Sequence, residues 1–318
     1  MTETSKSTPQ PRPQRPILGL HHVTAIASDP QRNLDFYAGV LGLRLVKKTV
    51  NFDDPGTYHL YFGDAEGSPG SILTFFPWPG ARQGHAGNGQ TQTTTFAAPA
   101  SSLGDWRRRL AAAGVAVEEL ERFGDKVLRF TDPDGLGLEV AGSAPEGDGT
   151  LQGFDAVTLQ VADGELTTAA LQVLGFRDVA SEGHRRRFEV ADGGVGARVD
   201  VVVTPQAPRA RSGAGTVHHV AFRNADDASQ AEWRGYLGAA GLWPTDVKDR
   251  QYFHSIYFRE PGGVLFELAT DPPGFAVDEA PESLGEGLML PPWFEARRSQ
   301  IEASLPPLRT PESEVRDA

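Results

Sequence analysis

The chain has 318 residues, a formal net charge of −12 and 39% apolar residues, so it can bury a large core and is long enough for about two domains. The acidic balance argues against a nucleic-acid-binding surface, and no window approaches the roughly 18 apolar residues of a membrane span. The absence of cysteine excludes disulfides and thiolate chemistry, so any metal must be held by His, Asp or Glu. Because the first residues lack the apolar core of a signal peptide, we expect a cytoplasmic protein with no nucleic-acid or membrane partner.

A polar tail precedes the periodic part of the chain. Residues 1–16 are rich in Pro, Gln, Ser and Thr, which predicts a disordered segment. From Leu18 onwards one unit recurs four times: a strand, a helix that ends near a glycine, and then strands joined by Gly, Asp and Pro turns. The first unit is the clearest, because HHVTAIAS is an apolar strand and Asp29 and Pro30 open a helix that Gly42 ends.

Four such units predict an α+β fold with two domains of two units each. We expect the first domain over residues 17–142 and the second over residues 153–270. Between them, residues 143–152 are rich in Gly, Pro and acidic residues, which is typical of a linker. The last segment, 271–318, contains a short amphipathic stretch between prolines, and we expect it to pack across the body as an arm.

Two His-His-Val sequences attract attention because the whole chain has only eight histidines. LHHVTAI begins the first unit and TVHHVAF begins the fourth. Neighbouring side chains of a strand face opposite sides, and the apolar residues that follow share the parity of His21 and His218. We therefore expect His22 and His219 to face the concave side of the sheet. His21 and His218 would face away from it, unless a bulge brings them to the rim.

A carboxylate on the closing strand of the fourth unit completes a set of metal ligands. Glu267 lies there, after the turn EPGG, and its counterpart in the second unit is Glu139 in DPDGLGLEV. Units one and four together supply His22, His219 and Glu267, whereas units one and two supply only His22 and Glu139. The first pairing gives a face of two histidines and one carboxylate, which leaves about three coordination positions open and is known to hold Fe(II) in oxygenases.

Three long stretches resemble a known family: LGLRLVKKTVNFDDPGTYHLYFGDAEGSPGSILTFFPWP at 41–79, DRQYFHSIYFREPGGVLFELATDPPGF at 249–275 and GEGLMLPPWFEARR at 285–298. Together with the repeated unit and its His and Glu positions, they resemble the ring-cleaving dioxygenases of hydroquinone type. These enzymes belong to the vicinal oxygen chelate superfamily, with the glyoxalases and bleomycin resistance proteins. The resemblance implies four βαβββ modules that form two open-barrel domains, and it implies self-association into a homo-oligomer.

The same resemblance implies an enzyme that inserts O2 into the ring of a hydroquinone or related phenol. Its metal would be Fe(II), with Mn(II) as the alternative, bound by His22, His219 and Glu267. The resemblance also implies roles around the metal for His21, Thr24, His218, Arg250 and Tyr257. In such a site His218 or Tyr257 would take the substrate proton, and Arg250 would stabilise negative charge.

Two other functions remain open at this stage. A Zn(II)- or Ni(II)-dependent lyase or isomerase of the glyoxalase kind would need a fourth protein ligand. A binding protein of the resistance type would sequester a ligand without chemistry, and intact metal ligands would be unexpected in it. Of the remaining candidates, Glu139, His59 and His254 are expected to be structural, and His85 and His184 are expected to be solvated.

Overall fold

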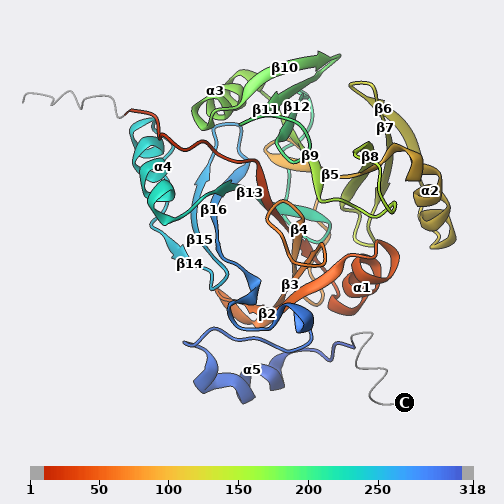
Figure 1. The fold of residues 1–318 in the computed structure, drawn as a ribbon, viewed down its shortest axis with the longest axis vertical. Helices are drawn as coiled ribbons and strands as arrows, with labels where there is room; N and C mark the ends of the chain where they lie inside the picture. Colours follow the sequence, from red (N-terminus) through yellow and green to blue (C-terminus); the bar gives the residue numbers. More distant parts are fainter. Residues whose placement is uncertain (1–10, 310–318) are drawn as a thin grey trace, which may run out of the picture.

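The computed structural model describes residues 11–309, in which sixteen strands form two eight-stranded sheets (Figure 1). The four βαβββ modules predicted from the sequence are confirmed. Module one contains β1 (Leu20–Ala27), α1 (Pro30–Leu34), β2 (Arg44–Asn51), β3 (Asp54–Gly63) and β4 (Ile72–Pro77). Module two contains β5 (Gln90–Pro99), α2 (Leu103–Ala112), β6 (Glu118–Arg122), β7 (Asp125–Thr131) and β8 (Gly137–Ala144).

The second half of the chain repeats the same order of elements. Module three contains β9 (Phe154–Val161), α3 (Gly164–Leu174), β10 (Arg177–Glu182), β11 (Arg185–Glu189) and β12 (Arg198–Val203). Module four contains β13 (Thr216–Asn224), α4 (Asp227–Ala239), β14 (Lys248–Asp249), β15 (Phe253–Arg259) and β16 (Leu265–Pro273). A last helix, α5 (Arg298–Ser304), lies in the C-terminal arm.

Each sheet combines modules that are distant in sequence. The first sheet has the order β14-β15-β16-β13-β1-β4-β3-β2 and joins modules four and one. The second has the order β10-β11-β12-β9-β5-β8-β7-β6 and joins modules three and two. At their centres β1 runs antiparallel to β13, and β5 runs antiparallel to β9. Each sheet therefore contains one module that precedes the predicted linker at residues 143–152 and one that follows it. The predicted division into two domains at that linker stays a prediction.

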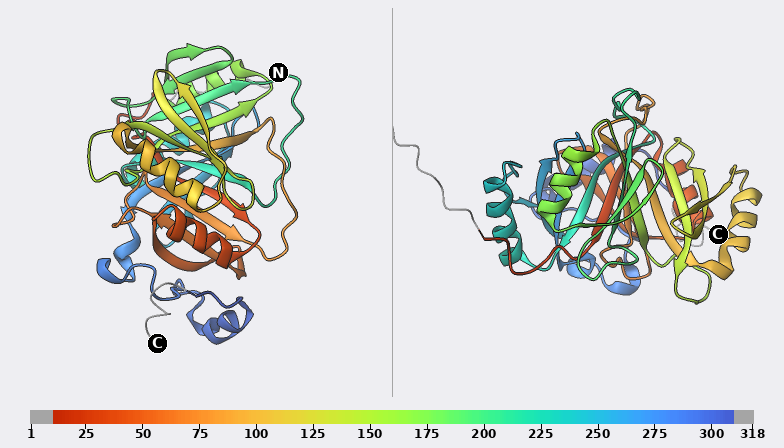
Figure 2. Two further views of the ribbon diagram at one scale, coloured as in Figure 1. Left: turned by 90° about the vertical axis from the view of Figure 1, so that its right-hand side faces the viewer. Right: turned by 90° about the horizontal axis from the view of Figure 1, so that it is seen from above.

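The residues predicted to begin and end the first helix do so in the structure. Asp29 caps the N-terminus of α1 by accepting a hydrogen bond from the backbone N–H of Arg32, and Pro30 is the first helical residue. The helix continues as a π-helical segment over Asp35–Val40, and Gly42 follows with a φ of +72°, which favours glycine. The helices lie on the outer faces of the curled sheets (Figure 2).

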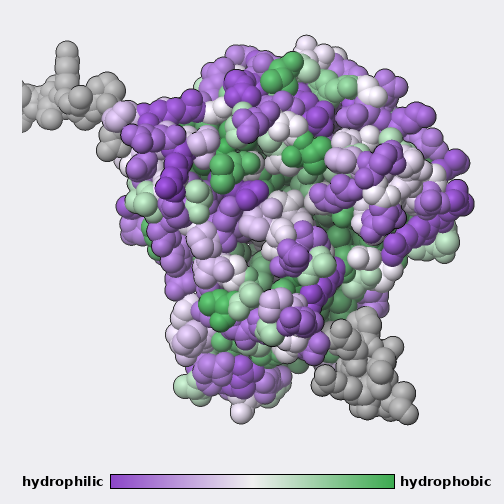
Figure 3. All heavy atoms as spheres, in the orientation of Figure 1, coloured by the Kyte–Doolittle hydropathy of each residue, from purple (hydrophilic) through white to green (hydrophobic). Residues whose placement is uncertain are grey.

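The apolar core lies between the helices and the convex faces of the sheets. Val23, Ala25, Val220 and Phe222 are fully buried there, as their alternation along β1 and β13 predicts. On the face of the molecule shown in Figure 3, hydrophilic side chains predominate and the apolar patches are small and separate. No helix within residues 11–309 has the length and apolar character needed to cross a membrane.

Both terminal segments contact the body where the structure describes them. The predicted disordered tail covers residues 1–16, of which residues 1–10 lie outside the described residues. Arg15 forms an ion pair with Asp226, and its carbonyl accepts a hydrogen bond from Trp233 Nε1 at 3.0 Å. The C-terminal arm lies under β2 and β3, where the Tyr58 hydroxyl donates to the Pro306 carbonyl at 3.0 Å (Figure 1).

A buried lysine fixes the start of this arm to β2. Lys47 is 0% exposed, and its Nζ lies 2.6 Å from Asp278 Oδ1 and 2.5 Å from Glu279 Oε2. The same ammonium group lies 5.0 Å from the ring centroid of Tyr252. Because a buried charge is costly without a partner, separation of the arm from β2 would leave three charges uncompensated.

We expect Lys47→Met to lower the free energy of unfolding by about 3–5 kcal/mol, because it leaves two largely buried carboxylates without their cation. Urea unfolding followed by circular dichroism measures this loss. The triple change Lys47→Met, Asp278→Asn and Glu279→Gln should recover most of it, since no unpaired charge remains. Lys126→Met, at an exposed position of β7, is the matched control. Equal stability of Lys47→Met and Lys126→Met would contradict the role given to Lys47.

Candidate metal centre

Both histidine doublets lie at β-bulges in the pairing of β1 with β13. The register shifts by one residue at His21 on β1 and at His218 on β13, so each is the extra residue of a bulge. A bulge interrupts the strict alternation of side chains and changes the direction in which the extra side chain points. Because a bulge is present on both strands, His21 and His218 can turn toward the ligand histidines instead of facing away from them.

Three buried side chains meet on the concave side of the first sheet. Nε2 of His22 lies 3.3 Å from Glu267 Oε2, and Nε2 of His219 lies 2.9 Å from the same oxygen. The two Nε2 atoms are 3.3 Å apart. These residues come from β1, β13 and β16, so the structure brings together the three ligands expected from units one and four. Within residues 11–309, the ligand atoms of these three residues lie within 4.8 Å of one another, which is close enough to share a metal ion.

The protonation states of Glu267 and His219 suit a divalent metal. Glu267 Oε1 accepts a hydrogen bond from Ser255 Oγ at 2.5 Å, whereas Oε2, among the described residues, has no hydrogen-bond partner and faces the two imidazoles. Burial alone would raise the pKa of Glu267, but the neighbouring imidazoles lower that pKa well below its usual range. Burial lowers the pKa of His219. An ionised carboxylate and a neutral imidazole are the forms that bind metals.

Each ligand histidine contacts the other histidine of its doublet. His22 Nδ1 lies 2.9 Å from His21 Nδ1, and His219 Nδ1 lies 2.7 Å from His218 Nδ1. A metal on Nε2 leaves the proton on Nδ1, so His21 and His218 would accept hydrogen bonds from the ligands. Burial lowers the pKa of His21 well below its usual value and lowers the pKa of His218 to about 4, which keeps both rings neutral acceptors at pH 7.

The second sheet has the same bulges without the same ligands. Gln92 on β5 and Asp155 on β9 are the extra residues in its central strand pair. The next residues along these strands, at the positions of the ligand histidines, are Thr93 and Ala156. The repeated backbone feature therefore occurs in both sheets, but imidazoles occupy it only in the first.

Glu139 has the position in the second sheet that Glu267 has in the first, and it is structural as predicted. Its Oε2 accepts a hydrogen bond from Thr95 Oγ1 at 3.0 Å, and Arg122 lies 3.8 Å from its Oε1. Glu139 is thus paired with a threonine and an arginine, and no histidine lies close enough to share an ion with it within residues 11–309. This difference makes Glu139 a matched control for Glu267.

A threonine occupies the strand position from which a fourth ligand could come. Thr74 on β4 has the place in module one that Glu267 has in module four, since β4 pairs with β1 as β16 pairs with β13. The Thr74 hydroxyl lies 3.1 Å from Thr24 Oγ1 and 2.6 Å from His59 Nε2. The set of protein ligands therefore contains two imidazoles and one carboxylate.

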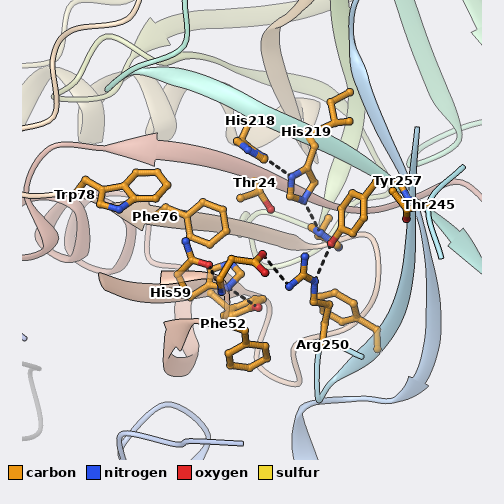
Figure 4. Close-up of a pocket in the computed structure, with 16 residues that line it drawn as sticks. Thr24, Phe52, His59, Phe76, Trp78, His218, His219, Thr245, Arg250 and Tyr257 are labelled. Atoms are coloured by element: carbon orange, nitrogen blue, oxygen red, sulfur yellow. Dashed lines mark hydrogen bonds and ion pairs between the residues drawn. The ribbon is translucent and has the colours of Figure 1, made fainter. Parts of the chain in front are cut away.

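The ligands lie beside a cavity of about 350 Å³ with aromatic walls. Trp78 and Phe76 lie on one side of this aromatic cavity, and Tyr257 and Arg250 lie on the opposite side (Figure 4). Arg250 Nε donates to the Tyr257 hydroxyl at 3.1 Å, and Arg250 Nη1 lies 3.1 Å from Asp53 Oδ2. Burial and the nearby Glu267 raise the pKa of Tyr257, so its hydroxyl stays protonated at neutral pH.

The residues expected around the metal divide into two groups. Thr24, His218, Arg250 and Tyr257 line the aromatic cavity. His21 lies behind His22 instead, with its ring centroid 5.1 Å from that of Phe253. His21 is therefore placed to orient a ligand and does not reach a molecule in the cavity.

His59 was expected to be structural, but it lines the aromatic cavity. Besides its contact with Thr74, its Nδ1 lies 2.8 Å from the Tyr61 hydroxyl. Alternation in TYHLYF places His59 and Tyr61 on one face of β3, and this is the sequence signal that could have found them. His254 forms a surface ion pair with Asp227 at 2.6 Å, and His85 and His184 are exposed as predicted.

Comparison with known proteins agrees with the geometry. The family model "Glyoxalase/Bleomycin resistance protein/Dioxygenase superfamily" matches residues 19–140. MhqO of Bacillus subtilis (strain 168), provisionally named a ring-cleaving dioxygenase, is 48% identical over 308 residues, which are 93% of this chain and 98% of MhqO. The chain belongs to this glyoxalase and dioxygenase superfamily. The predicted resemblance to its ring-cleaving members is thereby confirmed.

Other members of the superfamily support the same assignment. The chlorohydroquinone/hydroquinone 1,2-dioxygenase of Sphingobium indicum is 35% identical over 91% of this chain and 96% of that enzyme. The crystal structure of a Bacillus subtilis protein with the provisional name dioxygenase superposes with a TM-score of 0.88, at 46% identity over 93% of this chain and 98% of that one. Glyoxalase I from Zea mays has a TM-score of 0.61 at 16% identity, over 80% of this chain and 92% of that one, and so shares the fold.

We expect Glu267→Gln to lower the affinity for a divalent metal by more than about 100-fold, because the amide removes the single anionic ligand. Metal content after dialysis against a weak chelator measures the effect. Glu139→Gln should keep the metal content of the unchanged protein, since Glu139 is paired with Thr95 and Arg122 and lies outside the group of side chains that could share an ion. If Glu267→Gln retained its metal, the ligand assignment would be wrong.

The role of the bulge histidine can be tested by keeping or removing its acceptor atom. We expect His21→Leu to weaken metal binding by about 10–100-fold, because His22 Nδ1–H loses its acceptor. His21→Asn should bind metal more tightly than His21→Leu, since Asn Oδ1 can take the place of Nδ1. Gln92→Leu changes a bulge residue of the second sheet, which has no metal ligands, and is the control. Equal affinities for the Leu and Asn variants would contradict this role.

Proposed function

We propose that the protein is a ring-cleaving dioxygenase that uses Fe(II) to insert O2 into the ring of a hydroquinone or related phenol. The observation that carries the proposal is the face formed by His22, His219 and Glu267 beside a cavity with aromatic walls. Such a face leaves about three positions for other ligands, and Fe(II) oxygenases use these positions for substrate and O2. The names of the relatives in Bacillus subtilis and Sphingobium indicum support the reaction and the substrate class.

Ring cleavage of this kind balances without an external reductant. Both atoms of O2 enter the product, and the C–C bond beside the hydroxyl-bearing carbon breaks. The hydroxyl-bearing carbon becomes a carboxylic acid, and its former neighbour becomes an aldehyde, or an acyl group where the ring carries a substituent. A bound Fe(II) would supply the redox link between ring and O2 and the open positions that hold both.

The chain's own residues would orient the phenol and donate hydrogen bonds to it. Trp78 and Phe76 face the ring from one side, and the Arg250 guanidinium supplies positive charge from the other (Figure 4). Since burial raises the pKa of Tyr257, this residue donates a hydrogen bond, and the expectation that it takes the substrate proton is not supported. Nδ1 of His218 accepts from His219, so the proton of neutral His218 lies on Nε2, at the edge of the cavity, from which it would donate a hydrogen bond to the substrate.

The alternatives left open by the sequence fit less well. A glyoxalase-type isomerase would need a fourth protein ligand, and Thr74 occupies the strand position that could supply it. A binding protein without chemistry has no use for a buried carboxylate oxygen, Glu267 Oε2, that two imidazole nitrogens approach at 2.9 and 3.3 Å. The cytoplasmic location and the self-association predicted from the sequence stay predictions.

Oxygen uptake tests the proposal directly. Protein reconstituted anaerobically with Fe(II) should consume one O2 per hydroquinone and release a product that carries both a carboxylate and an aldehyde, as mass spectrometry and an oxygen electrode would record. Mn(II) protein tests the alternative metal, and Zn(II) protein should be inactive. Turnover without O2, or none with any hydroquinone, would overturn the proposal.

We expect Tyr257→Phe to lower kcat by about 100-fold with unchanged metal content, because a hydrogen-bond donor to the reacting oxygen is lost. Steady-state oxygen uptake measures the rate. Tyr58→Phe removes a hydroxyl that bonds the C-terminal arm outside the cavity, and its kcat should stay that of the unchanged protein. An unaltered rate for Tyr257→Phe would exclude the hydroxyl from the reaction.

A further inference from the structure

A second cavity adjoins the metal centre and differs from the aromatic cavity in chemistry. It has a volume of about 130 Å³ and shares His218, His219 and Leu265 with the aromatic cavity. Its other walls come from the start of β5, the loop before β13 and the turn between β15 and β16. The two cavities therefore adjoin at His218, His219 and Leu265, one with aromatic walls and one with polar walls.

Two arginines bring unpaired positive charge to the polar cavity. Among the described residues, the Arg209 side chain forms no hydrogen bond or ion pair, and the guanidinium of Arg259 donates only to the Gly263 carbonyl, at 2.5 Å. Both side chains line the cavity. In a chain with a net charge of −12, two guanidiniums that face one cavity without a carboxylate partner form a site for an anion.

Two residues at the cavity wall, Gln90 and Thr91, have buried polar atoms, Gln90 Oε1 and Thr91 Oγ1, that form no hydrogen bond within residues 11–309. Gln90 Nε2 donates to the Val217 carbonyl at 3.1 Å. Because both unpartnered atoms are closed off from solvent, the two guanidiniums are the charged groups available to a ligand in the cavity.

We propose that the polar cavity binds the carboxylate that ring opening creates; this inference rests on the proposed function. The uncleaved phenol has a flat apolar ring that matches the aromatic walls. After the C–C bond breaks, the molecule is a longer chain with a carboxylate at one end. Arg209 and Arg259 bind that carboxylate through charge-assisted hydrogen bonds.

The direct test is binding of a stable linear dicarboxylate, cis,cis-muconate, to the Fe(II) protein under anaerobic conditions. We expect calorimetry to give a dissociation constant about 10–100-fold higher for the double variant Arg209→Gln/Arg259→Gln, because two charge-assisted hydrogen bonds are lost. Arg107→Gln/Arg108→Gln on α2 removes the same charge far from the cavity and should bind as the unchanged protein does. Equal affinity for the Arg209/Arg259 variant and this control overturns the proposal.

A second measurement separates the two sources of a carboxylate. If the cavity takes the product, muconate should inhibit hydroquinone turnover less strongly in the Arg209→Gln/Arg259→Gln variant. If the polar cavity instead binds a carboxyl group on the intact ring, the Arg209→Gln/Arg259→Gln variant should have a higher KM for 2,5-dihydroxybenzoate, and muconate should inhibit it as strongly as it inhibits the unchanged protein. That result would overturn the product assignment. Arginine-dependent muconate binding in a protein that takes up no O2 would overturn the proposed function and leave the anion site in place.

Discussion

The antiparallel pairing of β1 with β13 is the constraint on which the metal centre depends. It joins the first strand of the chain to the first strand of the last module, and it contains a bulge on each strand. The pairing brings His22 and His219 within 3.3 Å of one another, and the bulges turn His21 and His218 toward them. A slip of one residue in this register would move the ligand side chains to the opposite face, so register and chemistry are linked.

The second sheet shows what the backbone contributes without the ligands. Its central strands repeat both bulges, and Glu139 repeats the place of Glu267. There the carboxylate is held by a threonine and an arginine, so its charge is satisfied by the protein itself. In the first sheet Glu267 keeps Oε2 without a hydrogen-bond partner among the described residues. One architecture thus supports a structural carboxylate or a metal ligand, depending on which side chains surround it.

The two sides of the metal centre differ in chemical character, one aromatic and one cationic. Aromatic side chains and the Arg250–Tyr257 pair face one side of the ligands, and two arginines without carboxylate partners in the described chain face the other. An apolar ring and an anionic chain need different walls, because desolvating a carboxylate is costly without cations. The arm held by Lys47 closes the first sheet beside Tyr252 and adds rigidity at this end of the molecule.

Strand periodicity, turn residues and the repeated unit were sufficient to derive the four modules and the helix signals at Asp29 and Pro30. They also predicted the three residues that meet at the candidate metal centre, because all of these depend on local order and on matched positions in a repeat. The bulges at His21 and His218 could not be derived, since a bulge is a property of two paired strands and is invisible in either one. The polar cavity could not be derived either, because it is assembled from segments distant along the chain, whose contacts exist only once the sheets have closed. His59 differs from these, since alternation along its own strand places it with Tyr61 on one face and only its position in the cavity needed the tertiary structure.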